Sequence, residues 1–257
     1  MIKHLSYLFF VFILCLFSCE KETEQSFCEI KKQNDTYEYP IKPGNYEWEQ
    51  LDSKEKIDAC QIPVDILSVI STEGLIESVL SNPLFGEIYL SNVNIQYGFN
   101  VFYKNFNGIR NLILRDDAAE KLLNRYKQMN PTCSQNNWPS LTGHGSNNNY
   151  AFSFIEIIIA QYSILTQIKD SGEMNAILQK IINKYDDKFL NGYSIVGLQH
   201  SMLICGRIMY LCNYAPFIDE YSNNECINFF INDAFLVDLD TLDIINDYVK
   251  KFLIQTK

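Results

Sequence analysis

The stretch 194–214, SIVGLQHSMLICGRIMYLCNY, decides the fold together with the stretch 150–169, YAFSFIEIIIAQYSILTQIK. In both stretches apolar residues occupy nearly every side of a helix, which is the pattern of a helix that other elements cover. A few polar residues interrupt them, namely Glu156, Gln161, Gln199, His200 and Arg207. These residues make both stretches too polar for membrane spans. We therefore predict two central helices in an all-α fold.

Helical signals continue on both sides of these two stretches. Capping residues, prolines at first turns and apolar residues at helical spacing predict a series of further helices. The predicted ranges are 53–60, 64–69, 83–90, 94–106, 116–129, 224–234 and 238–255, with one more helix that opens at 71–73. Strand signals are few. The fold is therefore predicted to be either an irregular multi-helix bundle or a stack of helical pairs.

Residues 130–149 break the helical pattern. Two prolines, two glycines and many Asn and Ser residues indicate a long loop. Loops of this length in compact domains are mostly functional or unstructured. The loop carries Trp138 and His144, which we interpret as possible binding residues because interfaces favour polar and aromatic surfaces of this kind. A loop without a role is the alternative.

The first nineteen residues have the layout of a bacterial secretory signal. A short basic start precedes an apolar run at 5–17, which is shorter than the roughly 20 residues of a spanning helix. The run ends in Leu16-Phe17-Ser18-Cys19, and this ending resembles the lipobox of bacterial lipoproteins. The resemblance implies that Cys19 becomes the mature N-terminus and carries the lipid. An ordinary signal cut nearby and an uncleaved anchor are the alternatives.

The predicted organisation has three parts: a lipoprotein signal at 1–18, an acidic tether at 19–36, and one mostly α-helical domain at 37–257. The acidic run at 20–24 resembles the surface-export signals of lipoproteins from Bacteroidota. This resemblance implies a lipid-anchored protein of the outer membrane, on its periplasmic or its external face.

Four short motifs resemble a group of uncharacterised exported lipoproteins from Bacteroidota. They are YPIKPG at 39–44, ACQIP at 59–63, STEGL at 71–75 and NFNG at 105–108. The likeness covers roughly residues 37–130. It implies an exported location and helical character, and it carries no known activity.

The charge balance bears on the partners. The chain has 21 basic and 31 acidic residues and a net charge of −10. Nucleic acids require basic stripes, so no nucleic-acid partner is expected. The hydrophobic share of 47% is enough for a sizeable core. The expected partners are the membrane, through the lipid on Cys19, and an envelope protein or glycan.

The cysteines permit disulfides without defining them. Six remain after the signal and the lipid attachment site are set aside: Cys28, Cys60, Cys133, Cys205, Cys212 and Cys226. An exported location allows disulfides, but the sequence does not choose among the pairings. Cys205 and Cys212 lie on one predicted helix, about 10 Å apart along its axis, and cannot bridge each other.

Catalytic and metal-binding patterns are scarce. The segment 143–146, GHGS, suggests a Ser/His pair, but the G-x-S-x-G elbow is absent. His200 is predicted to be a core histidine. Asp238, Asp240 and Asp243 resemble a calcium loop but lack its glycine and its terminal glutamate. We therefore predict no catalytic residue, no cofactor and no metal, and expect a non-catalytic binding or scaffold lipoprotein. The alternative is a hydrolase of the envelope or of external polymers.

Overall fold

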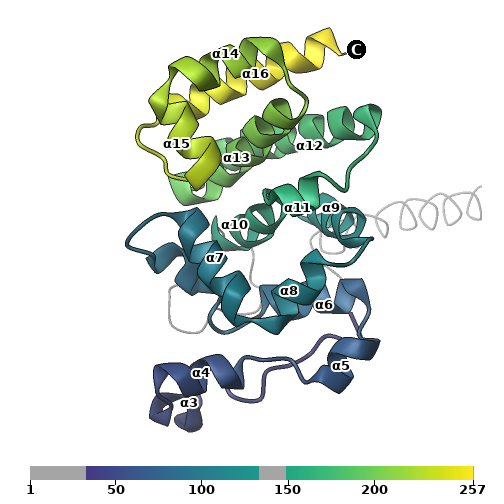
Figure 1. Ribbon diagram of the computed structural model, residues 1–257, viewed down its shortest axis with the longest axis vertical. Coiled ribbons are helices and arrows are strands. Elements are labelled where there is room, and N and C mark those ends of the chain that lie inside the picture. Colours follow the sequence, from purple (N-terminus) through teal and green to yellow (C-terminus); the bar gives the residue numbers. More distant parts are fainter. Residues whose placement is uncertain (1–32, 133–148, 257) are drawn as a thin grey trace, which may run out of the picture. The chain divides into compact units, whose positions relative to one another are not determined.

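All regular structure in the described part of the chain is helical (Figure 1). A computed structural model describes residues 33–132 and 149–256. No strand occurs within these two ranges, so the prediction of an all-α fold is confirmed. The predicted signal, Cys19 and most of the predicted tether lie outside the described residues.

The helices of the first range begin where the sequence supplies local caps. Asp52 and Glu55 form a capping box in which each side chain accepts the other residue's backbone N–H, at 2.8 and 2.9 Å. Ser71 accepts the Gly74 N–H at 2.9 Å, and Asn94 accepts the Tyr97 N–H at 2.7 Å in the same way. The elements are α3 (Tyr46–Gln50), α4 (Ser53–Ala59), α5 (Val64–Val69), α6 (Thr72–Leu80), η1 (Phe85–Leu90), α7 (Ile95–Asn105), α8 (Asn107–Ile113) and α9 (Ala118–Gln128).

The helix predicted at 83–90 is a 3₁₀ helix, η1, that starts at Phe85. Asn82 sets this start, because its side-chain oxygen accepts the Leu84 N–H at 3.0 Å. The Asn82 carbonyl accepts the Phe85 N–H three residues on, which is the hydrogen bond of a 3₁₀ turn.

The second range contains α10 (Asn149–Ile159), α11 (Tyr162–Leu165), α12 (Ser171–Leu190), α13 (Ile195–Leu211), α14 (Ala215–Asn223), α15 (Glu225–Asp233) and α16 (Asp240–Gln255). The prediction of one helix over 150–169 is wrong. The backbone at Gln161 is extended and interrupts the helix, and α11 starts after it. Two side chains take the carbonyls that α10 leaves free at its end. Arg207 donates to the Ala160 carbonyl at 2.8 Å, and Gln161 donates to the Ile157 carbonyl at 2.7 Å.

Helix α13 is the central helix of the second range. Its residues from Gly197 to Met209 are all buried, as the sequence predicted for a helix covered on most sides. It packs against α10, α12 and α16, and it also contacts α14 and α15 (Figure 1). Helix α10 in turn packs on α9, and α15 packs on α7. Helices of the first described range therefore pack directly against helices of the second.

In the two described ranges, no single helix has the length and hydropathy needed to cross a membrane. Helices α13 and α14 meet that requirement only as a pair, and the chain bends by 113° between them.

Candidate functional site

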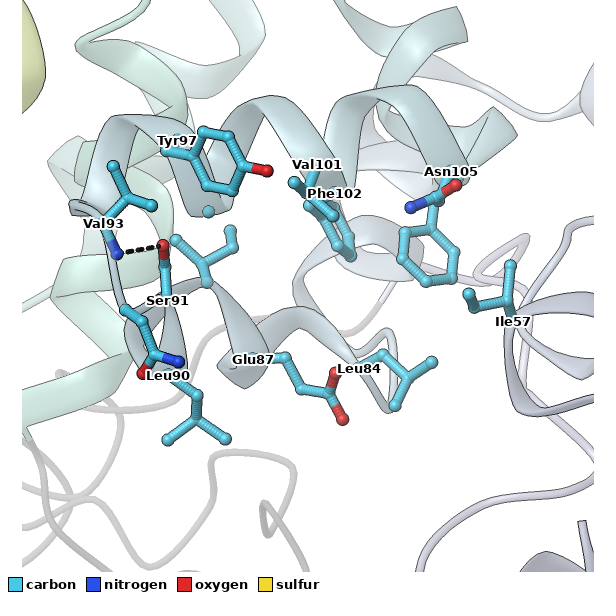
Figure 2. Close-up of a pocket in the computed structure, with 14 residues that line it drawn as sticks. Ile57, Leu84, Glu87, Leu90, Ser91, Val93, Tyr97, Val101, Phe102 and Asn105 are labelled. Carbon is cyan, nitrogen blue, oxygen red and sulfur yellow. Dashed lines mark hydrogen bonds between the residues drawn. The ribbon is translucent and has the colours of Figure 1, made fainter. Parts of the chain in front are cut away.

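A groove of about 450 Å³ lies between η1 and α7 (Figure 2). We call it the α7 groove. Figure 2 shows Tyr97, Val101 and Asn105 in a row along the α7 side, with Leu90 and Glu87 on the η1 side. The three α7 residues are four positions apart, so their row extends about 12 Å along the helix. The groove is therefore long enough to hold several side chains of a ligand.

Gly98 brings the two walls of the groove together. A Cβ atom at Gly98 would lie 2.2 Å from the Ile88 carbonyl oxygen, so only glycine permits this approach of α7 to η1. Beneath this contact the Phe102 ring packs on Phe85, with ring centroids 4.7 Å apart, and on Phe106, at 4.6 Å. These buried rings give the groove a rigid apolar base.

Exposed apolar side chains surround the α7 groove. Leu90 is 66% exposed, Val93 57%, Tyr97 52% and Val101 42%. Single exposed apolar residues are ordinary on protein surfaces, but these four all line one groove, and that clustering favours a binding site. Each square ångström of apolar surface that a ligand covers here contributes on the order of 25 cal/mol.

A few polar groups lie among the apolar residues that line the groove. The Glu87 side chain is exposed and forms no ion pair with any described residue. Within the described part of the chain, none of the residues that line the groove is Lys or Arg. Asn92 and Asn105 lie toward opposite ends of α7, and each carries an amide that can both donate and accept. An apolar cleft with a few convergent polar groups is the usual composition of a ligand site.

A second polar cluster is fully buried between α9, α10, α12 and α13. It consists of Tyr126, Glu156, Lys188 and Ser201. The Lys188 ammonium lies 2.9 Å from both Glu156 carboxylate oxygens and 2.6 Å from Ser201 Oγ, and it also donates to the Gly197 carbonyl at 2.7 Å. Glu156 Oε1 additionally accepts the Tyr126 and Ser201 hydroxyls, each at 2.8 Å. Every charged group in the cluster is therefore paired and hydrogen-bonded.

The contact between Ser201 and Lys188 has the spacing of a nucleophile and its base. Both residues are 0% exposed, however, and neither lines the α7 groove. Burial lowers the pKa of Lys188, and the adjacent Glu156 carboxylate opposes this shift. The Lys188 ammonium is fully hydrogen-bonded and both residues are buried. We therefore interpret the pair as part of the hydrogen-bonded core.

The described thiols are not poised for chemistry. Burial raises the pKa of Cys60 to about 12, and it raises the pKa of the Cys205 thiol further above its usual range. A nucleophilic cysteine requires the opposite shift. Four described cysteines are free, namely Cys60, Cys205, Cys212 and Cys226, while Cys28 and Cys133 lie outside the described residues.

His200 is a core histidine, as the sequence predicted. Its ring is 0% exposed, Nδ1 donates to the Val196 carbonyl at 3.1 Å, and the ring meets Tyr89 edge-on at 5.6 Å. Burial is the main cause that lowers the pKa of His200 to about 3, and the positive charges of Lys188 and Arg207 add to it. The ring is therefore neutral at physiological pH.

Arg207 joins three elements in the core. Its guanidinium donates to the Ile231 carbonyl and to the Ala160 carbonyl, both at 2.8 Å, and to the Gln96 side chain at 2.9 Å. The two carbonyls belong to the ends of α15 and α10, where helix dipoles favour a positive charge. Burial lowers the pKa of Arg207 to about 10, which still leaves it charged.

The binding residues predicted from the long loop, Trp138 and His144, lie outside the described residues and stay predictions. The same holds for Cys19 and for the segment 143–146. Asp238 accepts the Thr241 N–H at 2.9 Å at the start of α16. Among the described residues, no three His, Cys, Asp or Glu side chains gather in a way that could hold a metal ion.

Comparisons with protein-family models, with curated proteins and with solved structures find no match.

Proposed function

We propose that the protein is a lipid-anchored lipoprotein of the bacterial outer membrane that binds a protein partner without catalysis. The α7 groove is the observation that carries this proposal. It combines a rigid aromatic base, an exposed apolar rim and a few polar groups, among them Glu87, which forms no ion pair with any described residue. A partner that covers the exposed apolar residues removes their surface from water, and this burial stabilises the complex.

The apolar rim favours a protein partner over a glycan. The hydroxyl groups of a sugar would lose their water against Leu90, Val93 and Val101, and the groove offers few groups to replace those hydrogen bonds. Apolar side chains of a protein segment have no hydrogen bonds with water to give up on entry. Trp138 and His144 remain proposed contributors from the long loop.

The hydrolase alternative finds no support among the described residues. A substrate would need access to a nucleophile, and the Ser201–Lys188 pair is 0% exposed. The described thiols have raised pKa values where a nucleophile needs a lowered one. We therefore retain the non-catalytic proposal alone.

We also infer that the all-α body, predicted as one domain at 37–257, is an irregular bundle. In a stack of helical pairs each pair contacts only its neighbours. Helix α13 instead contacts five other helices, α10, α12, α14, α15 and α16. One helix that is shared by so many others supports a bundle.

A pull-down from native membranes tests the groove. The full lipidated protein is compared with Val101→Asp, which places a charge in the α7 groove, and with Val69→Asp. Val69 is an exposed valine on α5 that does not line the groove, so it controls for a new surface charge. We expect a protein that wild type and Val69→Asp retain and Val101→Asp loses, by quantitative mass spectrometry.

A purified complex completes the test. A segment of the retained protein, made as a synthetic peptide, is expected to bind wild type and not Val101→Asp, with both variants unfolding at similar urea concentrations. The proposal is wrong if Val101→Asp retains the same set of proteins as wild type.

A further inference from the structure

The α7 groove carries a charge asymmetry that selects among apolar ligands. Glu87 is an exposed residue on its η1 side, and none of the described residues that line the groove is cationic. Glu87 also forms no ion pair with any described residue. The chain as a whole carries a net charge of −10, which also favours a cationic partner over an anionic one.

We propose that the α7 groove recognises a short peptide segment in which two or three apolar side chains stand next to a Lys or Arg. This inference rests on the proposed function and names the chemistry of its partner. The apolar side chains cover Leu90, Tyr97 and Val101, and the cation pairs with Glu87. A cation beside a carboxylate at the edge of an apolar surface keeps part of its hydration while its stem covers the surface.

The dimensions of the groove fit a short segment. Its row of α7 side chains extends about 12 Å, which about four residues of extended chain span at roughly 3.3 Å each. Asn92 and Asn105 lie toward the two ends of α7 and present amides that can bond to backbone N–H and C=O groups. These amides orient a peptide backbone without selecting its side chains.

The same carboxylate disfavours anionic ligands of similar shape. A fatty acid or an anionic lipid would place its own negative charge in the groove close to Glu87, and like charges at short distance repel. The groove therefore distinguishes a basic peptide from an acidic amphiphile through one residue.

A peptide library tests this assignment. Random peptides are selected on the full-length chain held in nanodiscs, in parallel on wild type, Val101→Asp and Glu87→Lys. We expect peptides that bind wild type but not Val101→Asp to be enriched in Lys or Arg next to apolar residues. In fluorescence anisotropy, Glu87→Gln is expected to weaken a selected peptide about fivefold.

A charge exchange then isolates the pair. The selected peptide with its Lys replaced by Glu is expected to lose affinity for wild type and to regain it on Glu87→Lys. Rescue of this kind requires a direct pairing, because damage to the fold would weaken both peptides on the variant.

The outcomes separate this inference from the proposed function. If no selected peptide depends on Val101, the groove does not bind peptides and both proposals fail. If peptides depend on Val101 but show no basic preference and no charge rescue, only the assignment of Glu87 fails. A fatty acid that copurifies with wild type and is lost in Val101→Asp, detected by native mass spectrometry, would also overturn the peptide assignment.

Discussion

Lys188 and Glu156 show how a single buried charge depends on its partner. Both side chains are 0% exposed, and the ammonium contacts both carboxylate oxygens at 2.9 Å. Lys188→Met removes the cation and leaves the carboxylate buried with only hydroxyl donors. We expect the free energy of unfolding to fall by roughly 3–5 kcal/mol, measured by urea denaturation.

The double variant Lys188→Met, Glu156→Gln supplies the control. It removes both charges, so it is expected to recover part of the stability that the single variant loses. Losses that simply add in the double variant would contradict a pairing of the two charges.

His200 makes the stability of the fold depend on pH. Its pKa falls from 6.5 in the unfolded chain to about 3 in the folded one, chiefly through burial. Below pH 6.5, His200 is therefore protonated in the unfolded chain but stays neutral in the folded chain. As a result, the free energy of unfolding falls as the pH falls toward 3. The loss is expected to be roughly 1 kcal/mol per pH unit within that window.

Urea unfolding at pH 7.5 and pH 5.5 measures this slope in wild type and in His200→Gln, which cannot titrate. Few carboxylates titrate between these two values, so the difference between the proteins reports on His200. Equal slopes in both proteins would contradict the assignment.

At the scale of elements, the contact between α7 and η1 depends on Gly98. In Gly98→Ala the new Cβ would lie 2.2 Å from the Ile88 carbonyl oxygen, which is backbone and cannot rotate away. We expect the two elements to separate and the free energy of unfolding to fall by roughly 1–3 kcal/mol. Gly86→Ala is the matched control on η1, because its Cβ would meet only the Phe154 ring, at 3.9 Å. Circular dichroism melts of both variants check this, and equal melting temperatures would contradict it.

Local signals account for the helices that the sequence predicts well. Ser71 and Asn94 each accept an N–H three residues ahead, so the pattern and its contact lie within one turn. The break after α10 is different, because the Ala160 carbonyl is satisfied by Arg207, 47 residues later in the chain. No local pattern contains that partner. Helix α12, the longest of the described helices, is not among the predicted ranges, although its buried apolar residues stand at helical spacing: Ile177, Leu178, Ile181, Ile182 and Tyr185.

The candidate site is only partly predictable for the same reason. The helix at 94–106 is predicted from sequence and confirmed, but its sequence does not show which face stays exposed. Helix η1 packs on the neighbouring face of α7 and leaves Tyr97 and Val101 exposed. This packing is a tertiary contact, which the local sequence does not show. Gly98 inside a predicted helix is the one local signal of a close approach. The site predicted from the long loop, at Trp138 and His144, lies outside the described residues and remains a prediction.

At the scale of the whole molecule, membrane attachment is proposed to depend on Cys19. A net charge of −10 disfavours attachment through anionic lipid headgroups, which attract basic clusters. A lipid on Cys19 avoids this repulsion, since each buried CH₂ contributes about 0.8 kcal/mol and several acyl chains together give a stable anchor. In this proposal the tether holds the α7 groove near its partners and raises their effective concentration.

Mass spectrometry of the purified N-terminus is expected to find a chain that begins at an acylated Cys19. Cys19→Ser is expected to leave the membrane fraction, because it removes the thiol to which the lipid is attached. Cys15→Ser alters the other cysteine near the cleavage site, inside the apolar run, and is expected to stay anchored, so it controls for damage to the signal. An intact Met1, or an unmodified N-terminus elsewhere, would refute lipid anchoring. With an unmodified N-terminus elsewhere, the groove would have to find its partners from solution, without the gain in effective concentration that a shared membrane provides.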